Sequence, residues 1–270
     1  MPLKLKQSID KTEKEWCSRL QYRLEILFSC VWMPSHGVEH HLRVWAFAKE
    51  LLLLFVSAVE NMSEEFVEAL IVAVFFHDAG LTKTIGPEHG AAGSKLAEKF
   101  IKNQSENWKN RHTQEMLQAI VKHDDKTYAQ ASPWNSYVGI YELLAIADDL
   151  DALGCLGLTR YFEIYFQREM TENEITAEIL SNINSRFNFI SQWIYRADTV
   201  YLKHKQRYEK AIGFLEELKG KEIEILKNMF SQHINPLDIN VNLIDNKILR
   251  EFISDAQKEN EEIFTRYNFI

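Results

Sequence analysis

Helix breakers are scarce in this chain, which contains only ten glycines and five prolines among 270 residues. Each glycine or proline inside a helix costs free energy relative to alanine, so a chain with few of them favours long helices over many short strands. Apolar residues make up 46% of the sequence and charged residues 26%, which is the balance of a globular protein. We therefore expect an all-α fold.

The spacing of apolar residues predicts the individual helices. They are expected over residues 40–59, 63–76, 89–101, 116–123, 138–150, 187–194 and 212–226. Ser63 is followed by two glutamates, the pattern of a helix N-cap with acidic residues in the first turn. The clustered polar residues lie in residues 1–165, whereas residues 166–270 are predicted to be a helical C-terminal extension that packs on the same domain or stands apart.

Charge and cysteine content narrow the class of protein. The net charge of −8 argues against nucleic acid as a partner, because that binding depends on lysine and arginine. One basic stretch, residues 203–207, is expected to be a solvated helix face. No apolar run reaches the roughly 18 residues of a membrane span, and the first residues lack the pattern of a secretory signal. The three cysteines are too scattered for a disulfide framework, so we expect a cytoplasmic protein with no membrane partner.

Metal-capable side chains follow an apolar helix. His77 and Asp78 end the apolar run of residues 71–76, and His40 and Asp148 lie on two other predicted helices. Two imidazoles and two carboxylates suit a divalent ion such as Mn, Fe, Ni, Co, Zn or Mg. Asp148, Asp149 and Asp151 oppose the dipole of the helix that they end, so these acids require a nearby cation. On spacing alone, His36 or His41 could take the place of His40.

Three segments then resemble the ordered motifs of one family. HHLRV at residues 40–44 resembles H-x-x-R-V, FFHDAGL at residues 75–81 resembles L-H-D-I-G, and ADDLDALG at residues 147–154 resembles A-D-x-L-D-A-x-G. These motifs belong to the HD-domain metal-dependent phosphohydrolase superfamily, and the resemblance covers residues 36–160. It implies an HD-domain helical bundle, with additional C-terminal helices in this chain, and hydrolysis of a phosphate mono- or diester by a metal-activated water. The metal ligands that it implies are His40, His77, Asp78 and Asp148.

Two further histidines lie between the His-Asp pair and Asp148. Some HD proteins, including the HD-GYP phosphodiesterases, hold another ion through histidines at comparable places, which His89 and His123 occupy here. The Gly-Tyr-Pro signature itself is missing from this sequence, which argues against cyclic dinucleotides as the substrate. His89 and His123 therefore bind a second ion, contact the substrate phosphate or transfer protons. The sequence does not decide between a site with one ion and a site with two. The predicted catalytic residues are His77, Asp78, His89 and His123.

The resemblance also suggests a partner and leaves alternatives. The expected partner is a small phosphoester or nucleotide, and the C-terminal helices are a candidate surface for homo-oligomers. A nucleotide-sensing or regulatory scaffold without strong catalysis is the first alternative, and a di-iron oxygenase of the same superfamily is the second. Glu39 and Asp124 receive no role from the sequence. The candidates for substrate contact, or for support of the ligands, are His36, Arg43, Lys126, Asp151 and Arg160.

Overall fold

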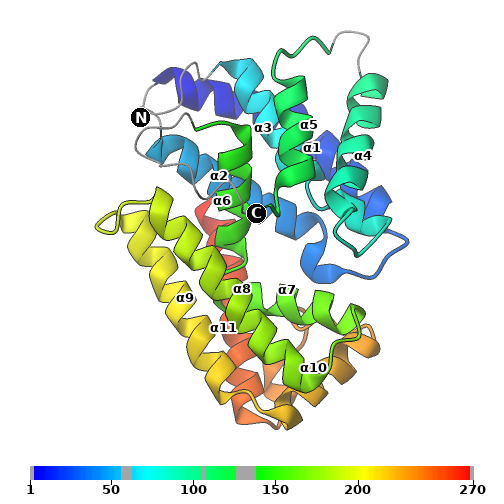
Figure 1. Ribbon diagram of the computed structural model, residues 1–270, viewed down its shortest axis with the longest axis vertical. Helices are drawn as coiled ribbons and strands as arrows, with labels where there is room; N and C mark the ends of the chain where they lie inside the picture. Colours follow the sequence, from blue (N-terminus) through cyan, green and yellow to red (C-terminus); the bar gives the residue numbers. More distant parts are fainter. Residues whose placement is uncertain (1–2, 56–62, 105–107, 126–137, 268–270) are drawn as a thin grey trace. The chain divides into compact units, whose positions relative to one another are not determined.

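A computed structural model describes residues 3–55, 63–104, 108–125 and 138–267 of the protein (Figure 1). The expected all-α fold is confirmed, since these residues form helices and turns and contribute no strand. The α-helices are α1 (Leu3–Phe28), α2 (Val38–Leu54), α3 (Glu64–Phe76), α4 (His89–Gln104), α5 (Thr113–Lys122), α6 (Ile140–Asp151), α7 (Gly154–Gln167), α8 (Glu172–Trp193), α9 (Thr199–Glu217), α10 (Gly220–Ser231) and α11 (Lys247–Arg266). Short 3-10 helices are η1 (Pro34–His36), η2 (Ala79–Thr82) and η5 (Val241–Leu243).

The chain forms two compact units. Unit 1 comprises residues 1–32 and 36–148, and unit 2 comprises residues 33–35 and 149–270. Helix α6 contributes to both, because the division falls after Asp148. The domain boundary that the sequence places near residue 165 stays a prediction. None of the described helices is both long enough and apolar enough to cross a membrane.

Helix α3 is the central helix of unit 1 and packs against α1, α2, α4 and α5 (Figure 1). Its residues from Phe66 to Phe76 are buried with the exception of Glu68, so the helix is apolar on every side. Ser63 caps its start as expected, since the Ser63 hydroxyl accepts the backbone N–H of Phe66 at 3.2 Å. A helix that is apolar all round belongs in a core. The residues that follow Phe76 therefore emerge inside the protein and not at its surface.

Helix α1 is an element that the sequence analysis did not name. It packs along α3, where the indole N–H of Trp16 donates to the Glu68 carboxylate at 2.9 Å. The Asn110 amide donates to the same carboxylate at 2.8 Å. Burial raises the pKa of Glu68 despite these two donors. The one acidic residue in the buried stretch of α3 is thus satisfied by hydrogen bonds, which is what its burial requires.

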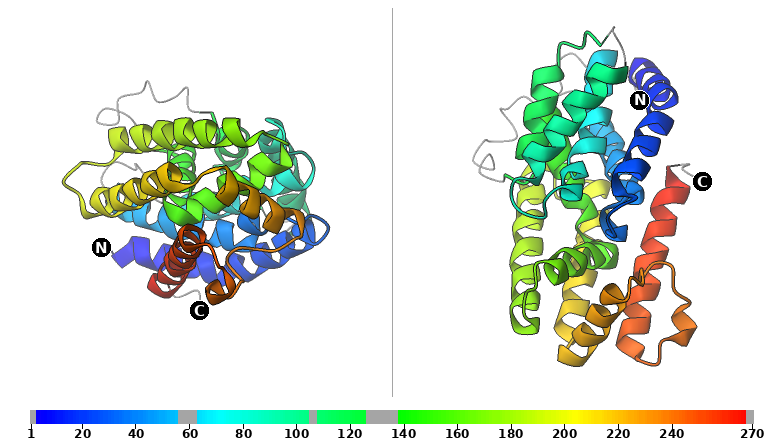
Figure 2. Two further views of the ribbon diagram at one scale, coloured as in Figure 1. Left: turned by 90° about the horizontal axis from the view of Figure 1, so that it is seen from below. Right: turned by 90° about the vertical axis from the view of Figure 1, so that its right-hand side faces the viewer.

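Helix α7 is the centre of unit 2. It packs against α8, α9, α10 and α11, and α8 and α9 lie side by side (Figure 2). The predicted helix over residues 212–226 is wrong as a single element, because α9 ends at Glu217 and α10 begins at Gly220. The chain is extended at Leu218, whose side chain is buried, and the Glu222 carboxylate accepts the backbone N–H of Lys219 at 3.2 Å. Apolar periodicity continues through this break, which hides it from the sequence.

The acidic end of α6 receives its cations from unit 2. Arg186 on α8 binds Asp149, which is fully buried, and Arg160 on α7 lies 3.4 Å from the Asp151 carboxylate. These arginines supply the compensating charge that acids at a helix C-terminus require. The sequence prediction of a nearby cation is therefore met at these two acids by side chains of the protein itself.

The basic stretch at residues 203–207 is not simply a solvated helix face, which corrects the expectation. His204 within it is fully buried. The Arg207 guanidinium donates to the carbonyl oxygens of Leu150 at 2.7 Å and Leu153 at 2.8 Å. The last carbonyls of a helix have no partner within the helix, so Arg207 acts as a side-chain cap for the end of α6.

Candidate metal centre

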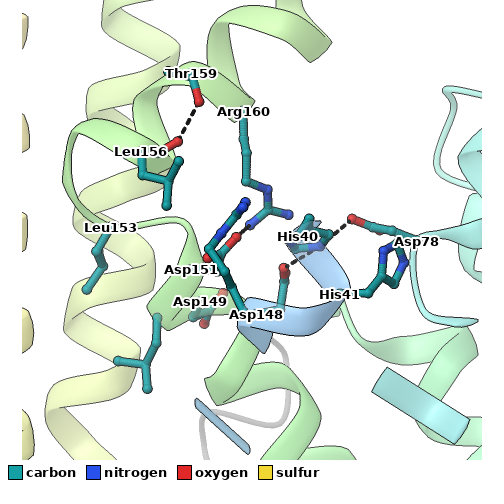
Figure 3. Close-up of polar contacts among 12 residues, drawn as sticks. His40, His41, Asp78, Asp148, Asp149, Asp151, Leu153, Leu156, Thr159 and Arg160 are labelled. Carbon is teal, nitrogen blue, oxygen red and sulfur yellow. Dashed lines mark hydrogen bonds and ion pairs between the residues drawn. The ribbon is translucent and has the colours of Figure 1, made fainter. Parts of the chain in front are cut away.

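Four buried side chains of unit 1 converge on one point. They are His40 from α2, His77 and Asp78 after the end of α3, and Asp148 from α6, and each offers a ligand atom within 4.8 Å of the others. Figure 3 shows the His40 ring between the carboxylates of Asp78 and Asp148. Its Nε2 lies 3.3 Å from Asp78 Oδ2 and 3.7 Å from Asp148 Oδ1. The Nε2 atoms of His40 and His77 are 3.0 Å apart.

These separations fit a shared metal ion. Ligand nitrogens about 2.1 Å from zinc are about 3.0 Å apart at a right angle and about 3.4 Å apart at the tetrahedral angle. The distance of 3.0 Å between His40 and His77 lies at the lower value, and that of 3.5 Å between His77 Nε2 and Asp78 Oδ2 lies near the upper one. The donors are two nitrogens and two oxygens, a set that suits a borderline or hard divalent ion. The residues present therefore fit the ion that the sequence predicts.

A second group of ligand atoms shares Asp78 with the first. Asp78 Oδ1 lies 3.2 Å from His123 Nε2 and 3.4 Å from His89 Nε2, and these two nitrogens are 3.2 Å apart. The other oxygen of the same carboxylate, Oδ2, faces His40 and His77. All three side chains of the second group are buried. Asp78 thus offers one carboxylate oxygen to each group of ligand atoms.

The imidazole rings are oriented by the backbone of their own helix ends. Nδ1 of His77 lies 2.7 Å from the carbonyl oxygen of Val74, and Nδ1 of His123 lies 2.8 Å from that of Ile120. His89 makes the same kind of contact with the carbonyl of Gly86 at 2.9 Å. A carbonyl oxygen can only accept, so Nδ1 carries the proton and donates it. The Nε2 lone pair of each ring is therefore left for a cation, as in metal sites whose ligands have supporting partners.

The residues after the His-Asp pair explain how His89 reaches Asp78. Helix α4, which begins at His89, packs directly on η2. A Cβ atom on Gly80 would lie only 1.8 Å from the carbonyl oxygen of His89, so no other residue fits at this contact. The glycine that follows His77-Asp78-Ala79 is thus required by the approach of α4, and this approach places His89 beside the carboxylate.

Charge coupling holds the metal-free cluster together. Burial lowers the pKa of His77, but the carboxylates of Asp78 and Asp148 outweigh burial and raise that pKa to about 10. Burial likewise lowers the pKa of His89, and Asp78 with Asp124 raises it to about 9. Burial raises the pKa of Asp78, yet the surrounding histidines bring it well below its usual range. Protons on the imidazoles thus offset the carboxylate charges at the places where a divalent ion would bind.

Of the three neighbouring histidines His36, His40 and His41, it is His40 that belongs to the first group of ligand atoms. His41 donates its Nδ1–H to the carbonyl of Gly37 at 2.9 Å, and burial with the neighbouring imidazoles His40 and His77 keeps its pKa well below the usual range. It is therefore a neutral neighbour of the ligand groups. The ring of His36 lies 5.9 Å from that of His40, centre to centre, and its support of the ligand groups stays a prediction. Its contact with a substrate stays a prediction.

The remaining predicted residues that the structure describes have contacts of their own. Arg43 is buried, with a guanidinium nitrogen 4.0 Å from the Glu39 carboxylate. Asp151 and Arg160 pair with each other in unit 2, and Lys126 lies outside the described residues. Substrate contacts for these residues stay predictions. Asp124, which had no predicted role, has its Oδ2 atom 3.4 Å from His89 Nε2. Its position next to His123 was the one signal that could have found it.

Comparisons with protein-family models, with curated proteins and with solved structures find no match to this chain. The described residues form a helical fold with a buried His/Asp cluster that could hold a metal ion, compatible with an HD-type site.

Proposed function

We propose that this protein is a metal-dependent phosphohydrolase of the HD type that cleaves a phosphate mono- or diester, with a nucleotide or related small molecule as substrate. One observation carries the proposal: the two oxygens of Asp78 face two separate histidine pairs. A carboxylate shared between two ions is the arrangement expected of a two-metal site that clamps the attacking and leaving oxygens of a displacement. The order of the three sequence motifs supports the same conclusion.

In this proposal the side chains of unit 1 divide the work. Divalent ions supply Lewis acidity toward the phosphoryl oxygens and lower the pKa of a water that attacks phosphorus. His40, His77 and Asp148 would hold one ion, His89 and His123 would hold the other, and Asp78 would offer one oxygen to each. Because these side chains are buried, they are held in place by packing and exclude bulk water from their side of the centre.

The proton for the leaving group has a candidate donor if only one ion binds. Asp78 and Asp124 outweigh the burial of His89 and raise its pKa to about 9, so this imidazole is protonated at neutral pH in the metal-free state. A protonated imidazole beside the centre can pass its proton to the departing oxygen. If two ions bind, His89 would be a ligand and the leaving group would take its proton from solvent. The number of ions thus decides the role of His89.

The test is hydrolysis by the purified full chain loaded with Mn²⁺, Fe²⁺, Ni²⁺, Co²⁺, Zn²⁺ or Mg²⁺. Nucleotides, cyclic nucleotides and simple phosphoesters are the substrates, and released phosphate or nucleoside is the readout. Asp78→Ala is expected to lose both metal and activity with an unchanged helical signal. His233→Asn is the matched control, because His233 is exposed in unit 2 and has a φ of 57°, which asparagine tolerates. Full activity of Asp78→Ala would refute the proposal.

The two alternatives make different predictions for the same preparation. A di-iron oxygenase is favoured by the same pair of ligand groups, but it would need dioxygen, so phosphoester hydrolysis under anaerobic conditions argues against it. A regulatory scaffold would show no turnover with any of the ions. It would also have no physical need for five buried ligand residues around Asp78, since buried carboxylates and imidazoles without a cation cost free energy.

A further inference from the structure

Asp124 stands in the same relation to the second histidine pair as Asp148 does to the first. Asp148 Oδ1 lies 3.7 Å and 3.6 Å from the Nε2 atoms of His40 and His77. Asp124 Oδ2 lies 3.4 Å and 3.9 Å from the Nε2 atoms of His89 and His123. The first group thus has four ligand residues whose atoms all lie within 4.8 Å of one another, and the second has three, with the Asp124 carboxylate beside its two imidazole nitrogens.

We propose that Asp124 is the fourth protein ligand of the second ion, and that this carboxylate makes the second ion the exchangeable one. The inference rests on the proposed two-ion centre, and it assigns a ligand to one half. With Asp124 included, both halves offer two nitrogens and two oxygens, so they take the same class of divalent ion. A difference between the halves must therefore come from their surroundings.

The surroundings differ in exposure to water. The Asp148 side chain is 3% exposed, and the Asp124 side chain is 48% exposed. An exposed carboxylate interacts with its ion through a higher effective dielectric constant, and water competes for its oxygens. It can leave the ion by a rotation of its own side chain, whereas Asp148 is held by the packing around α6. The ion of the second half is therefore expected to leave first.

The experiment counts ions and measures their release, with the full chain stripped by a chelator and reloaded with Mn²⁺. Wild-type protein is expected to bind two ions, with the second lost at least about tenfold faster on dilution into buffer with chelator. Asp124→Ala is expected to retain one ion and to weaken the second by about 100-fold, the upper end of the loss known for partners that support a metal ligand. Asp124→Asn keeps one oxygen and loses the charge. Its affinity for the second ion is expected to lie between that of the wild type and that of Asp124→Ala.

Matched variants make the result specific. Asp125→Asn alters the neighbouring exposed carboxylate and is expected to bind both ions as the wild type does. His123→Ala removes a buried ligand of the second half and is expected to mimic Asp124→Ala. Two ions of unchanged affinity in Asp124→Ala, or loss of both ions, would overturn the inference, as would a wild-type stoichiometry of one. The count of ions does not depend on turnover, so failure of the proposed phosphohydrolase activity would be seen separately, as absence of cleavage by protein that holds two ions.

Discussion

Gly90 on α4 lies against the carbonyl of Ile120 on α5, the same carbonyl that receives the Nδ1–H of His123. A Cβ atom on Gly90 would lie 3.0 Å from the Ile120 oxygen and 2.7 Å from that of Val121. The His123 hydrogen bond to Ile120 is 2.8 Å long. The contact between these two helices therefore also sets the direction of one metal-ligand candidate.

Gly90→Ala is expected to displace the Ile120 carbonyl and to tilt the His123 ring. Overpacking of this kind costs about 1–3 kcal/mol of stability. The affinity for the second ion should fall by about 10–100-fold, as when the partner of a ligating histidine is disturbed. Metal titration and chemical denaturation measure the two effects.

Gly213→Ala is the control for this substitution. Gly213 lies within α9, and nothing would contact its added Cβ within 4 Å. Alanine there is expected to stabilise the protein by about 0.5–1 kcal/mol, because glycine is the poorer helix former. Equal effects of the two substitutions would contradict the role given to Gly90.

Metal-free protein is expected to lose stability as the pH rises from about 7 to 10. The carboxylates around His77 and His89 outweigh the burial of these rings and raise their pKa values to about 10 and about 9 in the folded state, whereas an unfolded histidine titrates near 6.5. Between these values the folded chain binds more protons than the unfolded chain, so stability falls with pH. The slope is at most about 1.4 kcal/mol per pH unit for each histidine.

Urea denaturation in the presence of chelator, at several pH values, measures this slope. Metal-loaded protein is the comparison, since an ion replaces these protons and the slope should shrink or disappear. A metal-free protein that is as stable at pH 10 as at pH 7 would show that the two imidazoles are neutral in the folded state.

Removal of metal is expected to lower the thermal stability of the wild type. An ion at 100 times its dissociation constant stabilises the folded state by about 2.7 kcal/mol. Addition of Mn²⁺ to stripped protein should raise Tm in proportion to the logarithm of its concentration. In Asp148→Asn, Mn²⁺ should raise Tm only through the ion bound by His89 and His123. In Asp78→Ala, Mn²⁺ should not change Tm. A Tm that is independent of Mn²⁺ in the wild type would contradict the candidate centre.

Arg186→Ala is expected to destabilise the protein by about 3–5 kcal/mol, the cost of removing one partner of a buried ion pair. Its partner Asp149 is fully buried, so the carboxylate would lose this cation inside unit 2. Asp149→Asn added to this variant should recover part of the loss, because the uncompensated charge is gone. Lys247→Ala, in an exposed pair with Glu251, is the control and should cost less than about 1 kcal/mol.

The sequence predicted those parts of the fold that depend on neighbours in the chain. The helix starts at Ser63 and His89 were found in this way, because caps and apolar spacing are local signals. The break at Leu218 was missed, since the apolar pattern runs through it. Helix α8 is longer than predicted and begins at Glu172, with a capping box formed by Thr171 and Glu174.

The four residues of the first ligand group were identified by motif order, and the structure brings them together. Asp124 was not assigned, because its place next to His123 was the one local signal and its proximity to His89 depends on the packing of α4 against α5. Arg186 and Arg207, which bind residues at the end of α6, were not predicted for the same reason. Arg186 and Arg207 lie 37 and 57 residues along the chain from the α6 residues that they bind.

The hydrogen bonds from His77, His89 and His123 to carbonyls three residues earlier have a consequence for metal exchange. Each ring is aimed by its own turn of backbone and needs no ion to adopt its direction. A cation that displaces the Nε2 protons of His77 and His89 therefore binds rings that already point in the right direction, and little free energy is spent on ordering them. Replacing one divalent ion by another would then change affinity and reactivity while the protein frame stays the same, so cellular metal supply could select the resident ion without refolding the chain.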